Sequence, residues 1–360
     1  MLETIIELRS DTFTKPTPEM LQEMIKAEVG DAVYDEDPTV TKLEERVSEL
    51  FGKEAALFVP SGTMANLIAV MVHCNERGSE IIVGDISHYN LWEQGGVSQI
   101  GNVYAKQIPN NEDGTFDLEK FESLISDHTD CHCSRTRLVC IENTHNHCGG
   151  KVLPIEFIRD LRKICDKYDI RIHLDGSRVM NASLASGLSV KEISDGCDSV
   201  NFCFSKGLGA PVGSVLIGSK KFIEMAKRTR KVLGGSMRQV GILAGACLYA
   251  LDKANENLLK DHENAIKLAE GINGQGLLEV QKPETNIIHL KLGPKIKIAD
   301  FVNRLKTVNE SEVNRLGGVI KVNAGESDIK TIRLLSNLNV TTNQIDLAIK
   351  KINCVIEEFL

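Results

Sequence analysis

Lys206 and Asp175 are the residues whose type and position point most directly to chemistry. Lys206 follows the alternating run NFCFS (201–205) and precedes the turn-like GLGAP (207–211). Alternation predicts a strand, and glycine with proline predicts a turn, so this amine lies at a strand end and not on a charged helix face. Asp175 likewise closes the strand-like run 171–174 and precedes a glycine. Strand ends of this kind meet in the crevice at the carboxyl edge of a sheet.

A third feature is the stretch VPSGTMAN (59–66), in which a strand ends, a glycine allows a tight turn and a helix begins with hydroxyl residues. The free N–H groups and the positive dipole end of such a helix favour a phosphate group. An ordinary helix cap is the alternative explanation of the same pattern.

Together these features fit pyridoxal phosphate (PLP). This cofactor needs a lysine for a Schiff base, an acid that keeps its ring nitrogen protonated and a cradle for its phosphate. A surface lysine that keeps its ammonium group in water is the alternative for Lys206. His88, in DISHY (85–89), follows a predicted strand and could stack on the ring and transfer protons, although an isolated loop histidine is more often exposed.

The elements that would position these residues alternate along the first part of the chain. We expect helices at 18–27, 39–51, 63–73 and 154–168, and strands at 55–59, 80–83, 138–142, 171–174, 201–205 and 212–217. Such alternation predicts a mostly parallel sheet with helices on both faces.

The pattern changes after about residue 250. Helices are expected at 258–271, 298–306 and 344–359, and strands at 287–292, 319–322 and 331–335. We therefore expect a large cofactor-binding domain over 1–250, which includes an N-terminal active-site segment, and a small C-terminal α+β domain over 251–360.

The composition excludes several classes of protein. The chain has 360 residues, of which 42% are hydrophobic and 26% charged, with a net charge of −8. The acidic balance argues against nucleic-acid binding, and no apolar run approaches the roughly 18 residues of a membrane span. The acidic start MLETIIELRSDT lacks the basic region of a secretion signal, so we expect a cytoplasmic protein.

The ten cysteines are scattered along the chain, and we expect reduced thiols. Two clusters, CHC (131–133) and HNHC (145–148), hold enough soft ligands for zinc. Their spacing differs from that of a C-x₂-C knuckle, so we expect no metal site.

Seven motifs carry a resemblance to a known family. They are LRSDT (8–12), GD-x-x-Y-x-EDPT (30–39), FVPSGTM-x-N (58–66), ENTHN (142–146), HLDG-x-R (173–178), SKG with APVGS (205–214) and GG-x-MRQ (234–239). In this order and over residues 8–245 the chain resembles the low-specificity L-threonine aldolases.

The resemblance implies an α/β fold like that of aspartate aminotransferase, with a mostly parallel seven-stranded sheet in the large domain. It implies PLP as cofactor, a small amino-acid substrate and a homotetramer built as a dimer of dimers. The reaction would be retro-aldol cleavage of L-threonine or L-allo-threonine to glycine and acetaldehyde through an aldimine and a quinonoid. Such a reaction serves threonine catabolism and glycine biosynthesis.

The resemblance also assigns roles to residues of the cofactor site. Lys206 corresponds to the Schiff-base lysine, and Asp175 to the partner of the ring nitrogen. Arg178 would pair with the phenolate oxygen, and His88 would stack on the ring. The residues that would bind phosphate are Gly62 and Thr63.

Other residues correspond to substrate-binding and intersubunit positions. Ser10 and Arg333, together with Arg178, would bind the substrate carboxylate, for which a planar guanidinium is well suited. His132 corresponds to a loop histidine that reaches the substrate hydroxyl from an adjacent subunit. The basic residues that would approach a neighbouring site are Lys231 and Arg238.

Some questions stay open at this level. The base that removes the hydroxyl proton is His88, His132 or a bound water, and the preference between threo and allo substrates is undetermined. Asp35 and Ser177 replace a glycine and an alanine of the family, and two leucines follow Arg333 where the family has threonine and histidine. Another PLP enzyme of this fold, a catalytically inactive cofactor-binding protein and a zinc-organised binding protein are the alternatives.

Overall fold

The computed structural model describes residues 3–360, which divide into two compact units. The large unit comprises residues 16–206 and 210–253, and the small unit comprises the residues up to Lys15, 207–209 and 254–360. The predicted boundary near residue 250 remains a prediction. Among residues 3–360, no helix combines the length and the apolar character that a membrane span requires.

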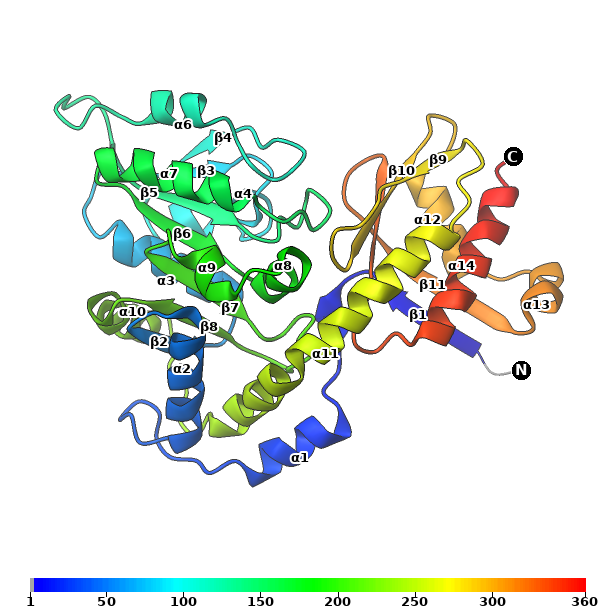
Figure 1. Cartoon of the computed structure of the whole chain (residues 1–360), viewed down its shortest axis with the longest axis horizontal. Coiled ribbons are helices and arrows are strands. Elements are labelled where there is room, and N and C mark those ends of the chain that lie inside the picture. Colours follow the sequence, from blue (N-terminus) through cyan, green and yellow to red (C-terminus); the bar gives the residue numbers. More distant parts are fainter. Residues whose placement is uncertain (1–2) are drawn as a thin grey trace. The chain divides into compact units, whose positions relative to one another are not determined.

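The large unit contains a seven-stranded sheet of order β2-β8-β7-β6-β5-β3-β4 (Figure 1). Its strands are β2 (Ala55–Val59), β3 (Ser79–Gly84), β4 (Tyr104–Ile108), β5 (Arg135–Glu142), β6 (Arg171–Asp175), β7 (Ser199–Cys203) and β8 (Ser214–Gly218). Only β8 pairs antiparallel with its two neighbours, and the other pairings are parallel. The expectation of a mostly parallel seven-stranded sheet is confirmed.

Helices alternate with these strands, and those expected at 18–27, 39–51, 63–73 and 154–168 are present. The alternating helices are α1 (Pro18–Lys26), α2 (Pro38–Phe51), α3 (Gly62–His73), α4 (His88–Leu91), α5 (Gly96–Gln99), α6 (Leu118–Leu124), α7 (Ile155–Lys167), α8 (Val179–Ser186), α9 (Val190–Ser194) and α10 (Lys220–Val232). Side chains of Thr17, Asp37 and Ser61 accept hydrogen bonds from first-turn N–H groups, which explains where α1, α2 and α3 begin. Apolar residues of α3 and α10 pack on β2 and β8 and hold the start of α3 against the sheet.

The small unit is built on a five-stranded sheet of order β1-β11-β12-β10-β9. Its elements are β1 (Glu3–Leu8), η1 (Asp11–Phe13), β9 (Leu278–Val280), β10 (Ile287–Leu292), α12 (Ile298–Lys306), α13 (Glu310–Leu316), β11 (Val319–Glu326), β12 (Thr331–Leu335) and α14 (Thr342–Glu357). β1 pairs parallel with β11, and the other pairings are antiparallel.

Several elements were not expected from the sequence, among them β4, β9, α6, α10 and α13, and two other departures have a clear physical reason. The helix expected from residue 258 begins at residue 241, as α11 (Gly241–Gly271), and belongs in part to each unit. Its first turns have the sequence GILAGACLYAL, in which small and apolar residues cover every face of the helix. This part therefore lacks the amphipathic stripe from which a helix is predicted. β1 was not predicted, because a strand whose partner lies more than 300 residues away has no local signature.

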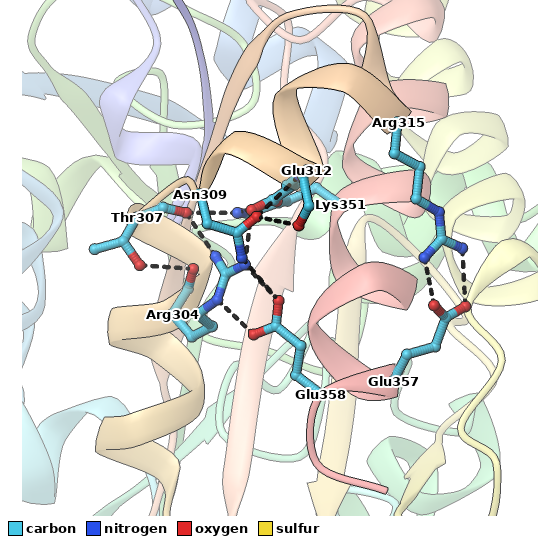
Figure 2. A network of polar contacts seen from close by, with 9 residues as sticks. Arg304, Thr307, Asn309, Glu312, Arg315, Lys351, Glu357 and Glu358 are labelled. Carbon is cyan, nitrogen blue, oxygen red and sulfur yellow. Dashed lines mark hydrogen bonds and ion pairs between the residues drawn. The ribbon is translucent and has the colours of Figure 1, made fainter.

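An ion-pair network joins the helices of the small unit (Figure 2). The ammonium group of Lys351 on α14 is fully buried and donates to Glu312 and to the carbonyl of Thr307, the latter at 2.6 Å. Nη2 of Arg304 lies 2.7 Å from Oε2 of Glu312 and 2.6 Å from Oε1 of Glu358. Every charge in this network therefore has a partner of opposite sign.

Candidate active site

Asp175 closes β6 and is 2% exposed. Its Oδ1 accepts from the backbone N–H of Ser177 and from Nδ2 of Asn201, both at 3.1 Å. Its Oδ2 accepts from Nδ2 of Asn66 at 3.0 Å. Both oxygens are thus held by donors, which fixes the plane of the carboxylate.

The charge on Asp175 is stabilised by its surroundings. Burial raises the pKa of this carboxyl, but the charges of Lys206 and His88 and the hydrogen bonds from Ser177 and Asn66 outweigh burial, so the pKa is lowered. Asp175 is therefore an anion at neutral pH. Asp175 and Lys206 both belong to the large unit, and the charge of Lys206 acts on this carboxyl.

Lys206 lies in the turn that joins β7 to β8. The turn is closed by hydrogen bonds from the N–H of Phe204 to the carbonyl of Gly213 at 3.0 Å, and from the N–H of Ala210 to the carbonyl of Phe204 at 3.1 Å. Gly213 has φ of 115°, and a Cβ there would lie 2.5 Å from the Phe58 ring. The glycine is required at this position, since a side chain would push Phe58 and the turn apart.

The start of α3 lies close to Asp175. Ser61 accepts from the N–H of Met64 at 3.2 Å, so the first N–H groups of the helix, those of Gly62 and Thr63, remain available as donors. A Cβ at Gly62 would lie 3.1 Å from Nδ2 of Asn201, the same amide that donates to Asp175. The helix N-terminus and the carboxylate are therefore joined through one side chain.

His88 begins α4 and is held by two carboxylates. Its backbone N–H donates to Glu142 at 2.9 Å, and its Nδ1 lies 2.8 Å from Oε1 of Glu93. Burial lowers the pKa of His88, but the hydrogen bond with Glu93 and the charges of Asp175, Glu93 and Glu142 outweigh burial and raise it. Burial raises the pKa of Glu93, which is 5% exposed.

Arg178 lies just past β6 and is buried. Its Nη1 lies 3.3 Å from Oδ1 of Asn146, and the N–H of Asn146 donates to Glu142 at 2.9 Å. Arg178 and His88 are thus linked through groups at the end of β5. A buried guanidinium three residues after Asp175 is suited to hold an anionic oxygen.

The sequence reasoning did not single out the residues that hold these groups. They are Asn66, Glu93, Glu142 and Asn201. Asn66 and Glu142 lie within two of the seven family motifs, and Asn201 opens the run that precedes Lys206, so their positions carried a signal. The position of Glu93 carried no such signal, because its contacts with Asn66 and His88 form only when the chain folds.

Three predicted intersubunit residues lie at the surface of the large unit. The side chain of His132 is 87% exposed and its Nδ1 pairs with Asp130 at 2.8 Å. Lys231 is exposed at the end of α10, and Arg238 pairs with Asp31 at 2.9 Å. Their predicted roles toward a neighbouring subunit remain predictions.

Ser10 and Arg333 belong to the small unit. Ser10 caps η1 by accepting from the N–H of Thr12 at 3.2 Å. Arg333 lies on β12, and its Nη2 is 3.4 Å from the carbonyl of Arg9. The small unit therefore brings Ser10 and Arg333, two of the three predicted carboxylate-binding residues, to one place, and their predicted role remains a prediction.

The ten cysteines are free thiols. Ligand atoms of Asp130, Cys131 and His132 lie within 4.8 Å of one another in an exposed loop. Cys148 lies apart from this loop, with its Sγ 3.6 Å from the carbonyl of Asn111. The two cysteine clusters that the sequence suggested therefore have separate surroundings.

The donor set of the large unit fits PLP. An anionic carboxylate stabilised by a lysine charge lies beside a helix N-terminus whose N–H groups can receive phosphate. His88, Arg178 and Lys206 would add a ring to stack, a cation for a phenolate oxygen and an amine for a Schiff base.

Comparison with known proteins agrees with this geometry. Residues 7–293 match the family model described as β-eliminating lyase. Low-specificity L-threonine aldolase 1 of Arabidopsis thaliana is 44% identical over 348 residues, which cover 96% of this chain and 94% of that protein. The chain belongs to the β-eliminating lyase family, among the low-specificity L-threonine aldolases.

Solved structures show how widely this fold is shared. The Leishmania major threonine aldolase aligns with a TM-score of 0.79 over 98% of this chain and 99% of its own, at 18% identity. The structure of SPT with its PLP internal aldimine aligns with a TM-score of 0.72 over 98% of this chain and 88% of its own, at 17% identity. The α/β fold expected from the sequence, like that of aspartate aminotransferase, is confirmed.

Proposed function

We propose that this member of the family uses PLP to cleave L-threonine or L-allo-threonine into glycine and acetaldehyde. The observation that carries the proposal is the buried Asp175 carboxylate, which is held by three donors and kept anionic by Lys206 and His88. An anion at this point favours a protonated pyridine nitrogen, and protonation makes the ring a strong electron acceptor.

When bound, PLP would supply the electron sink that allows the Cα–Cβ bond of the amino acid to break. The residues of this chain would bind and orient the reacting groups. Lys206 would hold the cofactor and exchange protons at its Nζ. Gly62 and Thr63 would bind the phosphate, and Arg178 the phenolate oxygen.

His88 is the proposed proton-transfer group of the large unit. Because Glu93 occupies its Nδ1, the ring nitrogen that remains for exchange is Nε2. The raised pKa of His88 means that the imidazole readily keeps a proton, so it can return one as well as accept one. His132 of a neighbouring subunit, or a bound water, is the alternative base.

The remaining roles follow from the family. Ser10, Arg178 and Arg333 would bind the substrate carboxylate and so orient the Cα–Cβ bond. Lys231 and Arg238 would approach the site of a neighbouring subunit in a homotetramer. We further propose that the enzyme works in the cytoplasm, in threonine catabolism and glycine formation.

The test is the absorbance spectrum of the purified protein with PLP, before and after addition of each threonine isomer, combined with an assay for acetaldehyde. We expect a visible band that requires Lys206 and that changes when substrate is added, together with acetaldehyde release. If the protein binds PLP but releases no acetaldehyde, it catalyses another PLP-dependent reaction. Failure to bind PLP would refute the proposal.

A further inference from the structure

Asn66 on α3 lies between two carboxylates. Its Nδ2 donates to Asp175 at 3.0 Å and to Glu93 at 2.8 Å. Because the ionised carboxylate of Asp175 only accepts, the amide nitrogen must face it and Oδ1 must point the other way. Oδ1 lies 3.3 Å from Nε2 of His173 on β6. An amide oxygen also only accepts, so His173 must carry a hydrogen on Nε2.

The same reasoning fixes the next two donors. His173 is fully buried, and burial lowers its pKa, so the ring is neutral and Nδ1 carries no hydrogen. Nδ1 therefore accepts from Oγ of Ser199 at 2.7 Å. Since the hydroxyl hydrogen is used there, Ser199 accepts from Nε2 of His73 at 2.8 Å. Burial lowers the pKa of His73 to about 4, so this ring is neutral too.

His73 is oriented by its own packing. It is the last residue of α3, is partly exposed and stacks on Phe222 with 4.7 Å between the ring centroids and 21° between the planes. The stack fixes the plane of the imidazole and so directs Nε2 at Ser199. The orientation of His73, at the partly exposed end of this row of hydrogen bonds, is thus fixed as well as that of the buried members.

The hydrogen bonds of this row all run in one direction, toward Asp175. We name it the donor chain, and its members, from the far end, are His73, Ser199, His173 and Asn66. Hydrogen bonds that point the same way polarise one another, and a low-dielectric interior strengthens them. The last hydrogen bond of the donor chain is the one that Asn66 donates to the carboxylate of Asp175.

We propose that the donor chain positions Asp175 and keeps it an anionic acceptor for the ring nitrogen of PLP, so that His73 influences the cofactor from the other end of α3. The inference rests on the proposed function, because it requires PLP to bind at Asp175. None of the first three members touches Asp175, and they act as positioning residues through Asn66.

Three variants test the donor chain. Ser199→Ala removes its middle link, and His73→Phe removes its first donor while it keeps a ring to stack on Phe222. His73→Gln restores an amide donor. Ser194→Ala is the matched control. Ser194 is an equally buried serine that is not a member of the donor chain, and its hydroxyl donates to the carbonyl of Val190 at 2.8 Å.

Two readouts do not depend on turnover. One is the dissociation constant of PLP, measured by titration of each apoenzyme. The other is the ¹⁵N chemical shift of ring-labelled PLP bound to each variant, which reports protonation of the pyridine nitrogen. We expect Ser199→Ala and His73→Phe to weaken PLP binding about three- to tenfold, which corresponds to the loss of one hydrogen bond, and to move the shift toward the unprotonated form. His73→Gln and Ser194→Ala should match the wild type.

The melting temperature of each apoenzyme separates this effect from poor folding. If Ser199→Ala does not fold, the comparison of His73→Phe with His73→Gln tests the donor chain instead. His73 is partly exposed, so its substitution disturbs folding less than that of a buried residue. Wild-type dissociation constants and ¹⁵N shifts in the folded variants would overturn the donor chain and leave the proposed function intact. Failure of the wild type to bind PLP would overturn both.

Discussion

The network of Figure 2 predicts that removal of its anion is far more damaging than removal of its buried cation. The two perturbations are Glu312→Gln and Lys351→Met. Both side chains are nearly inaccessible, with exposed fractions of 3% and 0%. The asymmetry arises because Glu312 pairs with two cations, Arg304 and Lys351, whereas the ion pair of Lys351 is with Glu312.

The magnitudes follow from what each change leaves behind. Glu312→Gln leaves a buried ammonium with neutral partners, and an uncompensated buried charge costs about 3–5 kcal/mol. Lys351→Met leaves Glu312 paired with Arg304 at 2.7 Å and fills most of the lysine volume, so we expect about 1–2 kcal/mol from the lost hydrogen bonds. The double variant should be more stable than Glu312→Gln alone, because it removes the stranded charge.

The assay is urea unfolding of the three variants and the wild type, followed by far-ultraviolet circular dichroism at one pH and one PLP concentration. The slope of the free energy of unfolding against urea must be unchanged for the midpoints to be compared. A Lys351→Met variant as unstable as Glu312→Gln, or a double variant in which the two losses add, would refute the reasoning.

Three further predictions concern the large unit. Lys206→Ala should lower acetaldehyde release from threonine by at least about 10³-fold and abolish the visible band of the bound cofactor, since it removes the nucleophilic amine; a band that persists would contradict its role. Asp175→Asn should lower kcat by roughly 10²-fold or more, because a neutral amide no longer stabilises charge at the ring nitrogen; unchanged turnover would contradict it. The pKa of His73 is about 4 in the folded protein and near 6.5 when unfolded, so the unfolded state binds the proton more readily and stability is lost as the pH falls from 6.5 toward 4. His73→Phe should flatten this part of a plot of melting temperature against pH, and an unchanged slope would show that other groups cause it.

Much of the candidate site was predictable because its residues close strands or open helices. Runs that alternate in hydropathy and end at glycine placed Asp175 and Lys206 at one sheet edge, and hydroxyl residues after a strand marked the start of α3. Asn66 and Glu93 were not predicted as holders of these groups. Their contacts join α3, β6 and the segment after α4, and sequence spacing alone does not show which side chains meet there.

The fold was predictable where its signals are local. The strands of the large unit other than β4 were found because each is a short apolar run between turn signals, whereas β4 (Tyr104–Ile108) was not predicted. The first half of α11 and the strand β1 were missed, the former for want of an amphipathic stripe and the latter because its pairing is distant. The roles of Ser10, His132, Lys231, Arg238 and Arg333 remain predictions.

The pairing of β1 with β11 has a consequence for synthesis of the chain. Glu7 contacts Asn323, 316 residues later, so at ribosomal speeds β1 waits about 15–60 s for its partner. An apolar strand with an open edge invites aggregation during that time, and charged residues reduce the risk. In ETIIEL two glutamates flank the apolar centre, and in the folded protein Glu3 pairs with Lys321 at 2.6 Å. The same charges that would keep the nascent strand in solution later help to secure it in register with β11.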